Sequence, residues 1–155
     1  MARVLRIGVA LSLFAVLTLG AGSVAADAGG SHKVFDENMI GLPAPGVVIA
    51  GVTGAGHAWA IDHGNAKIFS DGRVLVNVDG LVLTPEDTNP VTSGRAVVSC
   101  NGGATSADIV MSDIVPFSVP DGDAHVNQWL SLPDPCSNPV VFFTNAAGKW
   151  FAVTD

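Results

Sequence analysis

The chain has 155 residues and a formal net charge of −7, with 48% apolar residues, only 14% charged residues and no tyrosine. This length allows one domain that buries its own core. The basic residues are few and scattered, so we expect neither nucleic acid nor an acidic membrane surface as a partner, because both need a positive patch.

The first 26 residues have the three-part pattern of a secretory signal peptide. Two arginines give the positive start, an apolar run follows, and small residues precede a cleavage site after Ala26 or, alternatively, after Ala28. We therefore predict a signal helix over residues 1–26. Its removal leaves five basic and fourteen acidic residues, a net charge of −9. We expect the mature protein outside the cell and free of the membrane; an uncleaved N-terminal anchor is the alternative.

Residues 27–45 combine glycines, prolines and acidic side chains, which predicts an irregular N-terminal arm. One compact domain is expected over residues 46–155. Within it, the apolar run 47–52 lies between glycines and predicts a first buried strand. Residues 57–61 predict a second strand, with Trp59 and Ile61 on one face.

The clearest pattern lies in residues 66–83. Three valines between positions 74 and 78 alternate with other residues, which is the two-residue period of a strand with one buried face. Asp71-Gly72 precedes them and predicts a hairpin with residues 66–69, because glycine accepts a positive φ. At Asp79-Gly80 either a bulge or a second tight turn fits the sequence.

The rest of the chain predicts further short strands and contains no helical stripe. About seven to ten strands with frequent turns indicate an all-β fold. Length and strand spacing favour a single β-sandwich, immunoglobulin-like or with a related Greek-key topology, over a small closed barrel. The further predicted strands are residues 95–100, 124–132, 140–144 and 150–153, together with 108–111 and 114–119, which form two short strands or one kinked strand.

Cys100 ends one predicted strand, and Cys136 lies in a proline-rich turn before another. An exported chain with only these two cysteines is expected to join them in a disulfide. The alternative is a nucleophilic Cys100. A reactive thiol needs a base or a cation beside it, and the residues around Cys100 include neither.

His57, Asp62 and His63 are a candidate metal site, because two imidazoles and a carboxylate are common metal ligands. If residues 57–63 form a strand, both histidines share a face but lie about 20 Å apart. The competing interpretation is therefore a set of ordinary surface polar residues. No motif predicts a catalytic residue or a cofactor-binding loop, so we expect no catalytic residues and no cofactor.

Trp129 alternates with His125 and Asn127 and is the tryptophan that we expect on an outer face. An exposed tryptophan there could form part of a binding surface for a carbohydrate or a protein partner. Packing in the core is the alternative.

The stretch Ser-Asp-Gly-Arg-Val-Leu-Val-Asn-Val-Asp-Gly-Leu-Val-Leu at residues 70–83, the leader, and the closing Leu-Pro-Asp-Pro-Cys and Trp-Phe-Ala-Val-Thr segments resemble small exported proteins of actinobacteria. Those proteins have no assigned activity. The resemblance implies a secreted all-β domain with one cysteine pair, and it carries over no functional residue. We expect a secreted, non-catalytic domain that acts by surface binding outside the cell or at the cell envelope. The alternatives are a metal-dependent or hydrolytic extracellular enzyme and a secreted inhibitor or ligand-binding module.

Overall fold

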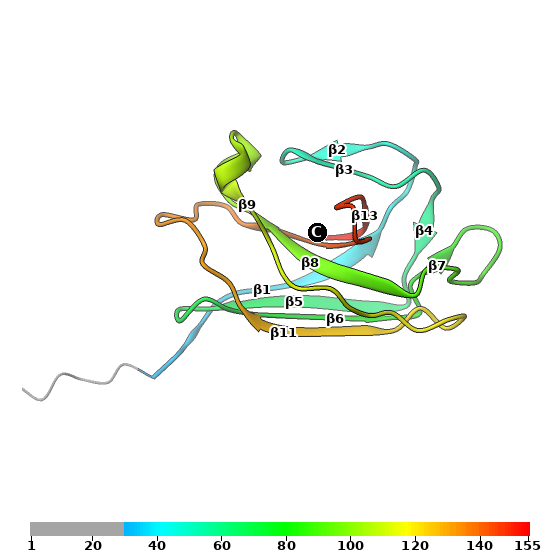
Figure 1. The fold of residues 1–155 in the computed structure, drawn as a ribbon, viewed down its shortest axis with the longest axis horizontal. Helices are drawn as coiled ribbons and strands as arrows, with labels where there is room; N and C mark the ends of the chain where they lie inside the picture. The colour runs from blue at the N-terminus through cyan, green and yellow to red at the C-terminus, as the bar shows by residue number, and fades with distance from the viewer. Residues whose placement is uncertain (1–29) are drawn as a thin grey trace, which may run out of the picture.

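The computed structural model describes residues 30–155 (Figure 1). The predicted signal peptide, its cleavage sites at Ala26 and Ala28, and the start of the expected arm lie outside these residues. Within the described range the regular structure consists of strands and two single-turn 3₁₀ helices. The all-β prediction is confirmed.

Eight antiparallel strands follow one another in a single sheet, in the order β10-β8-β12-β13-β1-β5-β6-β11, and β9 also pairs with β8. Two small sheets are separate from it, one formed by β2 and β3 and the other by β4 and β7. The strands are β1 (Lys33–Gly41), β2 (Val48–Ile49), β3 (Val52–Thr53), β4 (Trp59–Ala60), β5 (His63–Phe69), β6 (Arg73–Asp79), β7 (Val82–Leu83), β8 (Ser93–Ser99), β9 (Ile109–Met111), β10 (Val115–Pro116), β11 (Ala124–Trp129), β12 (Val140–Thr144) and β13 (Trp150–Thr154).

The large sheet curls until its two end strands meet. Strand β10 contacts β11, and the backbone N–H of Asp113 donates a 2.8 Å hydrogen bond to the side-chain oxygen of Gln128 on β11. Figure 1 shows β5, β6 and β11 as one layer, with β8 and β13 on the other side of the core. The hydrogen bonding thus gives one curled sheet, not the two separate sheets of the predicted sandwich.

Strand β1 connects the two layers. It pairs with β5 along residues 33–38 and with β13 along residues 39–41. The prediction of an irregular arm over residues 27–45 is therefore wrong for Lys33–Gly41. Met39 is the one buried side chain of this strand, so its sequence lacks the apolar alternation from which a strand is predicted.

The core lies between the layers. The predicted pattern of β6 is confirmed, because Val74, Val76 and Val78 all have no exposed surface. Aromatic side chains fill one end of the core: the ring centres of Trp59 and Phe151 are 4.2 Å apart. These contacts place Trp59 in the interior.

The layer that contains β8, β12 and β13 is buried on both faces, because the β2–β3 hairpin packs on its outer side. The Trp150 indole N–H donates to the Val47 carbonyl at 3.2 Å, and the Ser99 hydroxyl donates to the Ala50 carbonyl at 2.7 Å. The single strand predicted over 47–52 is this hairpin, which turns at Ala50 and Gly51 with φ values of 42° and 79°. Within residues 30–155, the outer face of β1, β5, β6 and β11 has no such cover.

Candidate functional site

The outward side chains of β1, β5, β6 and β11, here called the open face, are the candidate site. Side chains alternate between the two faces of a strand. Burial of Ala66 and Ile68 on β5 and of Val74 and Val76 on β6 therefore turns the residues between them outward. The cross-strand pairing arranges these outward residues in rows across the sheet.

At one end of the open face, three large side chains form a row. The Arg73 guanidinium lies 4.1 Å from the centre of the Phe69 ring, a cation–π arrangement. Trp129 is directly opposite Arg73 on β11 and is 67% exposed. Trp59 and Trp150, at 5% and 0%, are buried in the core. The structure therefore places Trp129 on an outer face, as the sequence indicates.

The Asp71 carboxylate holds this row from the β5–β6 turn. It accepts hydrogen bonds from the Arg73 backbone N–H at 3.0 Å and from the Trp129 indole N–H at 3.3 Å. The Arg73 backbone hydrogen bond, with smaller contributions from Ser31, Trp129 and the Arg73 charge, holds the pKa of Asp71 below its usual value. The indole is thus oriented by a carboxylate that stays ionised at neutral pH.

A second row crosses all four strands and consists of Asn38, Asn65, Asn77 and His125. The Asn77 side-chain N–H donates to the Asn65 side-chain oxygen at 2.9 Å. The Asn77 oxygen is hydrogen-bonded to His125 Nδ1. Three polar side chains from three strands are therefore linked side by side, which fixes their orientations on the surface.

Between these two rows lie two charged side chains, Asp36 and Lys67, and two uncharged ones, Leu75 and Asn127. Lys33 forms an ion pair with Asp36 on β1, and Lys67 is directly opposite Asp36 on β5. The Lys33 hydrogen bond, followed by the charges of Lys33 and Lys67, lowers the pKa of Asp36. Opposite charges are therefore adjacent here, so no field of one sign extends over the centre of the open face.

The predicted metal ligands lie at the far end of the open face and beside it. His63 begins β5 opposite Asp79, and Asp62 lines the same hollow. His57 lies in the loop before β4 and is not among the residues that line this hollow. Within residues 30–155, no group of three or more His, Cys, Asp or Glu side chains is arranged to hold a metal ion. The structure thus brings Asp62 and His63 together, but not with His57.

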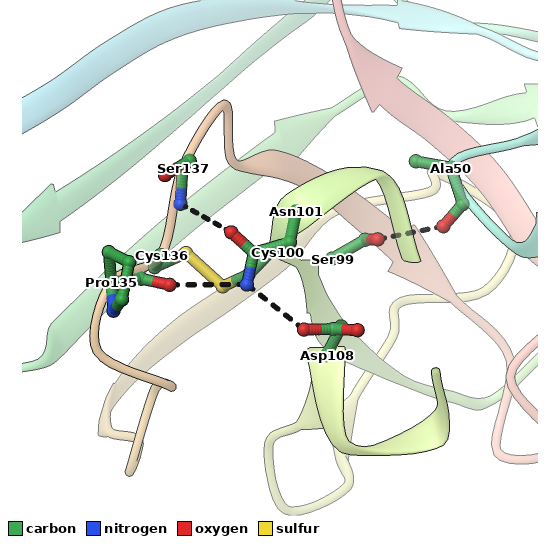
Figure 2. Close-up of a disulfide and its surroundings, with 8 residues drawn as sticks. All are labelled: Ala50, Ser99, Cys100, Asn101, Asp108, Pro135, Cys136 and Ser137. Atoms are coloured by element: carbon green, nitrogen blue, oxygen red, sulfur yellow. Dashed lines mark hydrogen bonds between the residues drawn. A yellow bond between two sulfur atoms is a disulfide. The ribbon is translucent and has the colours of Figure 1, made fainter. Parts of the chain in front are cut away.

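Cys100 and Cys136 form the predicted disulfide, with their Cα atoms 4.8 Å apart (Figure 2). Figure 2 shows Asn101 beside it, contacting the loop that carries Cys136. The Asn101 side chain donates to the Pro135 carbonyl at 3.1 Å and accepts from the Ser137 backbone N–H at 3.0 Å. Both cysteines of the chain are in this bond, so neither supplies a reactive thiol.

No helix in the described range is long and apolar enough to span a membrane. No protein-family model matches the chain, and no curated protein and no solved structure is significantly similar to it. The role of the open face is therefore inferred from its geometry alone.

Sequence reasoning identified Trp129 but missed the side chains around it. Asn65, Asn77 and His125 lie on three different strands. The register in which these strands pair cannot be read from the sequence, so only the structure shows that the three side chains are neighbours. The sequence did indicate part of this surface, because Arg73 and Asn77 both occupy outward positions of the strand with the clearest alternation.

Proposed function

We propose that this protein is an exported, non-catalytic binding module that engages its ligand across the open face. One observation carries the proposal: a tryptophan that is 67% exposed stands on the sheet face left uncovered by the rest of the described chain. Exposing so large an apolar surface costs free energy that a bound partner would recover. Large exposed aromatics are typical of binding sites.

The side chains around Trp129 support a binding role. Arg73 is held by the Phe69 ring, and Trp129 is held by Asp71. The polar row is held by its own hydrogen bonds. A ligand that meets side chains already fixed in position loses less conformational entropy on binding, which favours affinity.

Export is part of the proposal. A disulfide between Cys100 and Cys136 persists in oxidising compartments and is rare in the cytosol. The leader pattern of residues 1–26 points the same way. We place the protein outside the cell or at the cell envelope, as the resemblance to small exported actinobacterial proteins implies.

The test is co-sedimentation of the exported protein, purified from culture medium, with a washed cell-envelope fraction of the producing cells. We expect Trp129→Ala to lower the bound fraction at least tenfold. Val48→Ala is the matched control, because Val48 is 62% exposed but lies on β2, away from the open face. Equal sedimentation of all three proteins would overturn the proposed site. Turnover of a hydrolase substrate panel that a single polar substitution abolishes would overturn the non-catalytic role.

A further inference from the structure

The hydrogen bonds of the polar row determine which groups remain for a ligand. Asn77 uses its amide N–H toward Asn65, so its oxygen faces His125 and must accept the proton of His125 Nδ1. The neutral His125 ring therefore carries its proton on Nδ1 and keeps an acceptor at Nε2. Asn65, whose oxygen accepts from Asn77, keeps its own amide N–H groups as donors. The row thus presents an acceptor near its β11 end and donors toward β1.

The centre of the open face is electrically balanced although the molecule is acidic. Residues 30–155 contain five basic and thirteen acidic side chains. The four strands of the open face and the β5–β6 turn hold three of the basic ones, Lys33, Lys67 and Arg73, and three of the acidic ones, Asp36, Asp71 and Asp79. Two further carboxylates, Asp62 and Asp123, lie next to Asp79 beyond the far end of the face. A polyanion or a polycation would find no complementary field here, so the charge pattern matches a neutral ligand.

The distribution of apolar groups differs from that of a protein–protein interface. Such an interface has an apolar centre and a polar rim, and charged residues are depleted at the centre. On the open face the centre holds the polar Asn65, Asn77, Lys67 and Asn127 and a single apolar side chain, Leu75, whereas Phe69 and Trp129 lie at one end. A largely polar centre with an aromatic side chain at one end matches a ligand that is rich in hydroxyl groups and has an apolar ring face.

We propose that the ligand of the open face is a neutral polysaccharide, with one sugar ring packed on Trp129 and neighbouring hydroxyls bonded to the Asn65–Asn77–His125 row. This inference rests on the proposed binding role of the open face. Trp129 and His125 are four residues apart on β11, a separation of about 13 Å at the usual strand rise. That distance accommodates several linked sugars, and an open surface suits a chain better than a single small molecule.

The test is native affinity electrophoresis of the exported protein in gels that contain one soluble polysaccharide each. The neutral probes are hydroxyethyl cellulose, a galactomannan and dextran, and the anionic probe is polygalacturonate. We expect retardation in at least one neutral gel and none in the anionic gel. Trp129→Ala should weaken binding at least tenfold, and Asn77→Ala about fivefold. Val48→Ala, on the exposed β2–β3 hairpin away from the open face, should bind as the unchanged protein does.

A second variant of the row separates lost binding from lost folding. His125 is exposed, so His125→Ala removes one end of the row without opening the core, and it should also weaken retardation severalfold. Thermal unfolding of every variant confirms that it is folded.

Each outcome decides one of the two proposals. Retardation by polygalacturonate alone, or by none of the probes, overturns the neutral polysaccharide. Neutral binding that is indifferent to Trp129→Ala overturns the open face as the site. Envelope binding could depend on Trp129, survive periodate oxidation of the glycans and be lost after protease treatment. That result would leave the proposed binding role intact and overturn the sugar ligand.

Discussion

Asn101 donates a hydrogen bond from its side-chain amide to a carboxylate oxygen of Asp108, 3.0 Å away, immediately beyond Cys100. The same asparagine also bonds the loop that carries Cys136. One side chain therefore ties the end of β8, the 3₁₀ helix Ser106–Asp108 and the disulfide loop together. Its backbone has a φ of 55°, a left-handed conformation that asparagine tolerates better than most residues.

We predict that Asn101→Ala lowers the free energy of unfolding by about 2 kcal/mol, because several hydrogen bonds of about 1 kcal/mol are lost. Asn138→Ala is the matched control. Asn138 also has a positive φ, 48°, but its side chain makes no hydrogen bond to any other residue of the described range. Urea unfolding measures both variants, and equal losses would contradict the bonding role of the Asn101 side chain.

The acid limit of stability should depend on Asp108. The side-chain hydrogen bond from Asn101, followed by those from Thr105, holds the pKa of Asp108 below its usual value. A carboxyl with a lower pKa in the folded protein stabilises the fold above the unfolded-chain value of about 3.9. That stabilisation is lost as the pH falls through the folded value.

We therefore expect Asp108→Asn to be less stable at neutral pH and to lose less of its remaining stability in acid. Urea midpoints at neutral and acidic pH measure this. Asp121→Asn serves as the control, because no hydrogen bond to the Asp121 side chain is found in residues 30–155. A stability–pH curve for Asp108→Asn that is parallel to that of the unchanged protein would contradict the prediction.

Removing the disulfide should be costly. Its two cysteines are 36 positions apart, and closing a loop of that size stabilises by about 4 kcal/mol in the chain-entropy model. We expect the double variant Cys100→Ala with Cys136→Ala to lose about that much in denaturant unfolding. A loss below about 1 kcal/mol would mean that the Asn101 contacts hold the loop without the bond.

Trp129 should be the tryptophan that quenchers reach. Trp59 and Trp150 are 5% and 0% exposed, against 67% for Trp129. We expect acrylamide to quench part of the native fluorescence, and Trp129→Phe to leave emission that resists the quencher. The free energy of unfolding should change by less than about 0.5 kcal/mol, as for other surface substitutions. Unchanged quenching in the variant would contradict the exposure of Trp129.

The close approach of Gly122, two residues before β11, to Leu81, which immediately precedes β7, offers a test of the packing. Gly122 has a φ of 77°, and an added Cβ would lie 2.2 Å from the Leu81 carbonyl oxygen. Gly46 has a similar φ of 72° but has nothing within 4 Å of that position. We predict a loss of about 1–2 kcal/mol for Gly46→Ala, from the left-handed backbone alone. Gly122→Ala should lose about 1–3 kcal/mol more because of the clash. Thermal or urea unfolding of the two variants compares them directly, and equal losses would contradict the close approach.

The parts of the fold that were predicted correctly are those in which local pattern and burial agree. The β5–β6 hairpin follows from Asp71-Gly72 and the valines of β6, and Gly72 has the positive φ of 82° that the turn requires. The β12–β13 hairpin follows from two apolar runs, because both faces of these strands are buried.

The misses arise where burial and pairing depend on distant segments. Strand β1 is held mainly by its two neighbours, β5 and β13. Its exposed Asp36 and Glu37 follow each other in the sequence, so β1 does not show the alternation of buried and exposed residues that predicts a strand. The same strand makes the sheet continuous, which length and strand spacing, the grounds for predicting a sandwich, do not show. The polar row was missed for a related reason, since Asn65, Asn77 and His125 become neighbours only through the register.

The position of β1 between the layers has a consequence for the order of folding. Ile40 pairs with Val153, so a strand made early must wait for one made late before the sheet can close. Closing so long a loop costs entropy before any contact compensates for it, which slows folding. The sheet of such a nascent chain stays incomplete until β13 has been synthesised, and an incomplete fold is what the proposed export through a narrow channel would require.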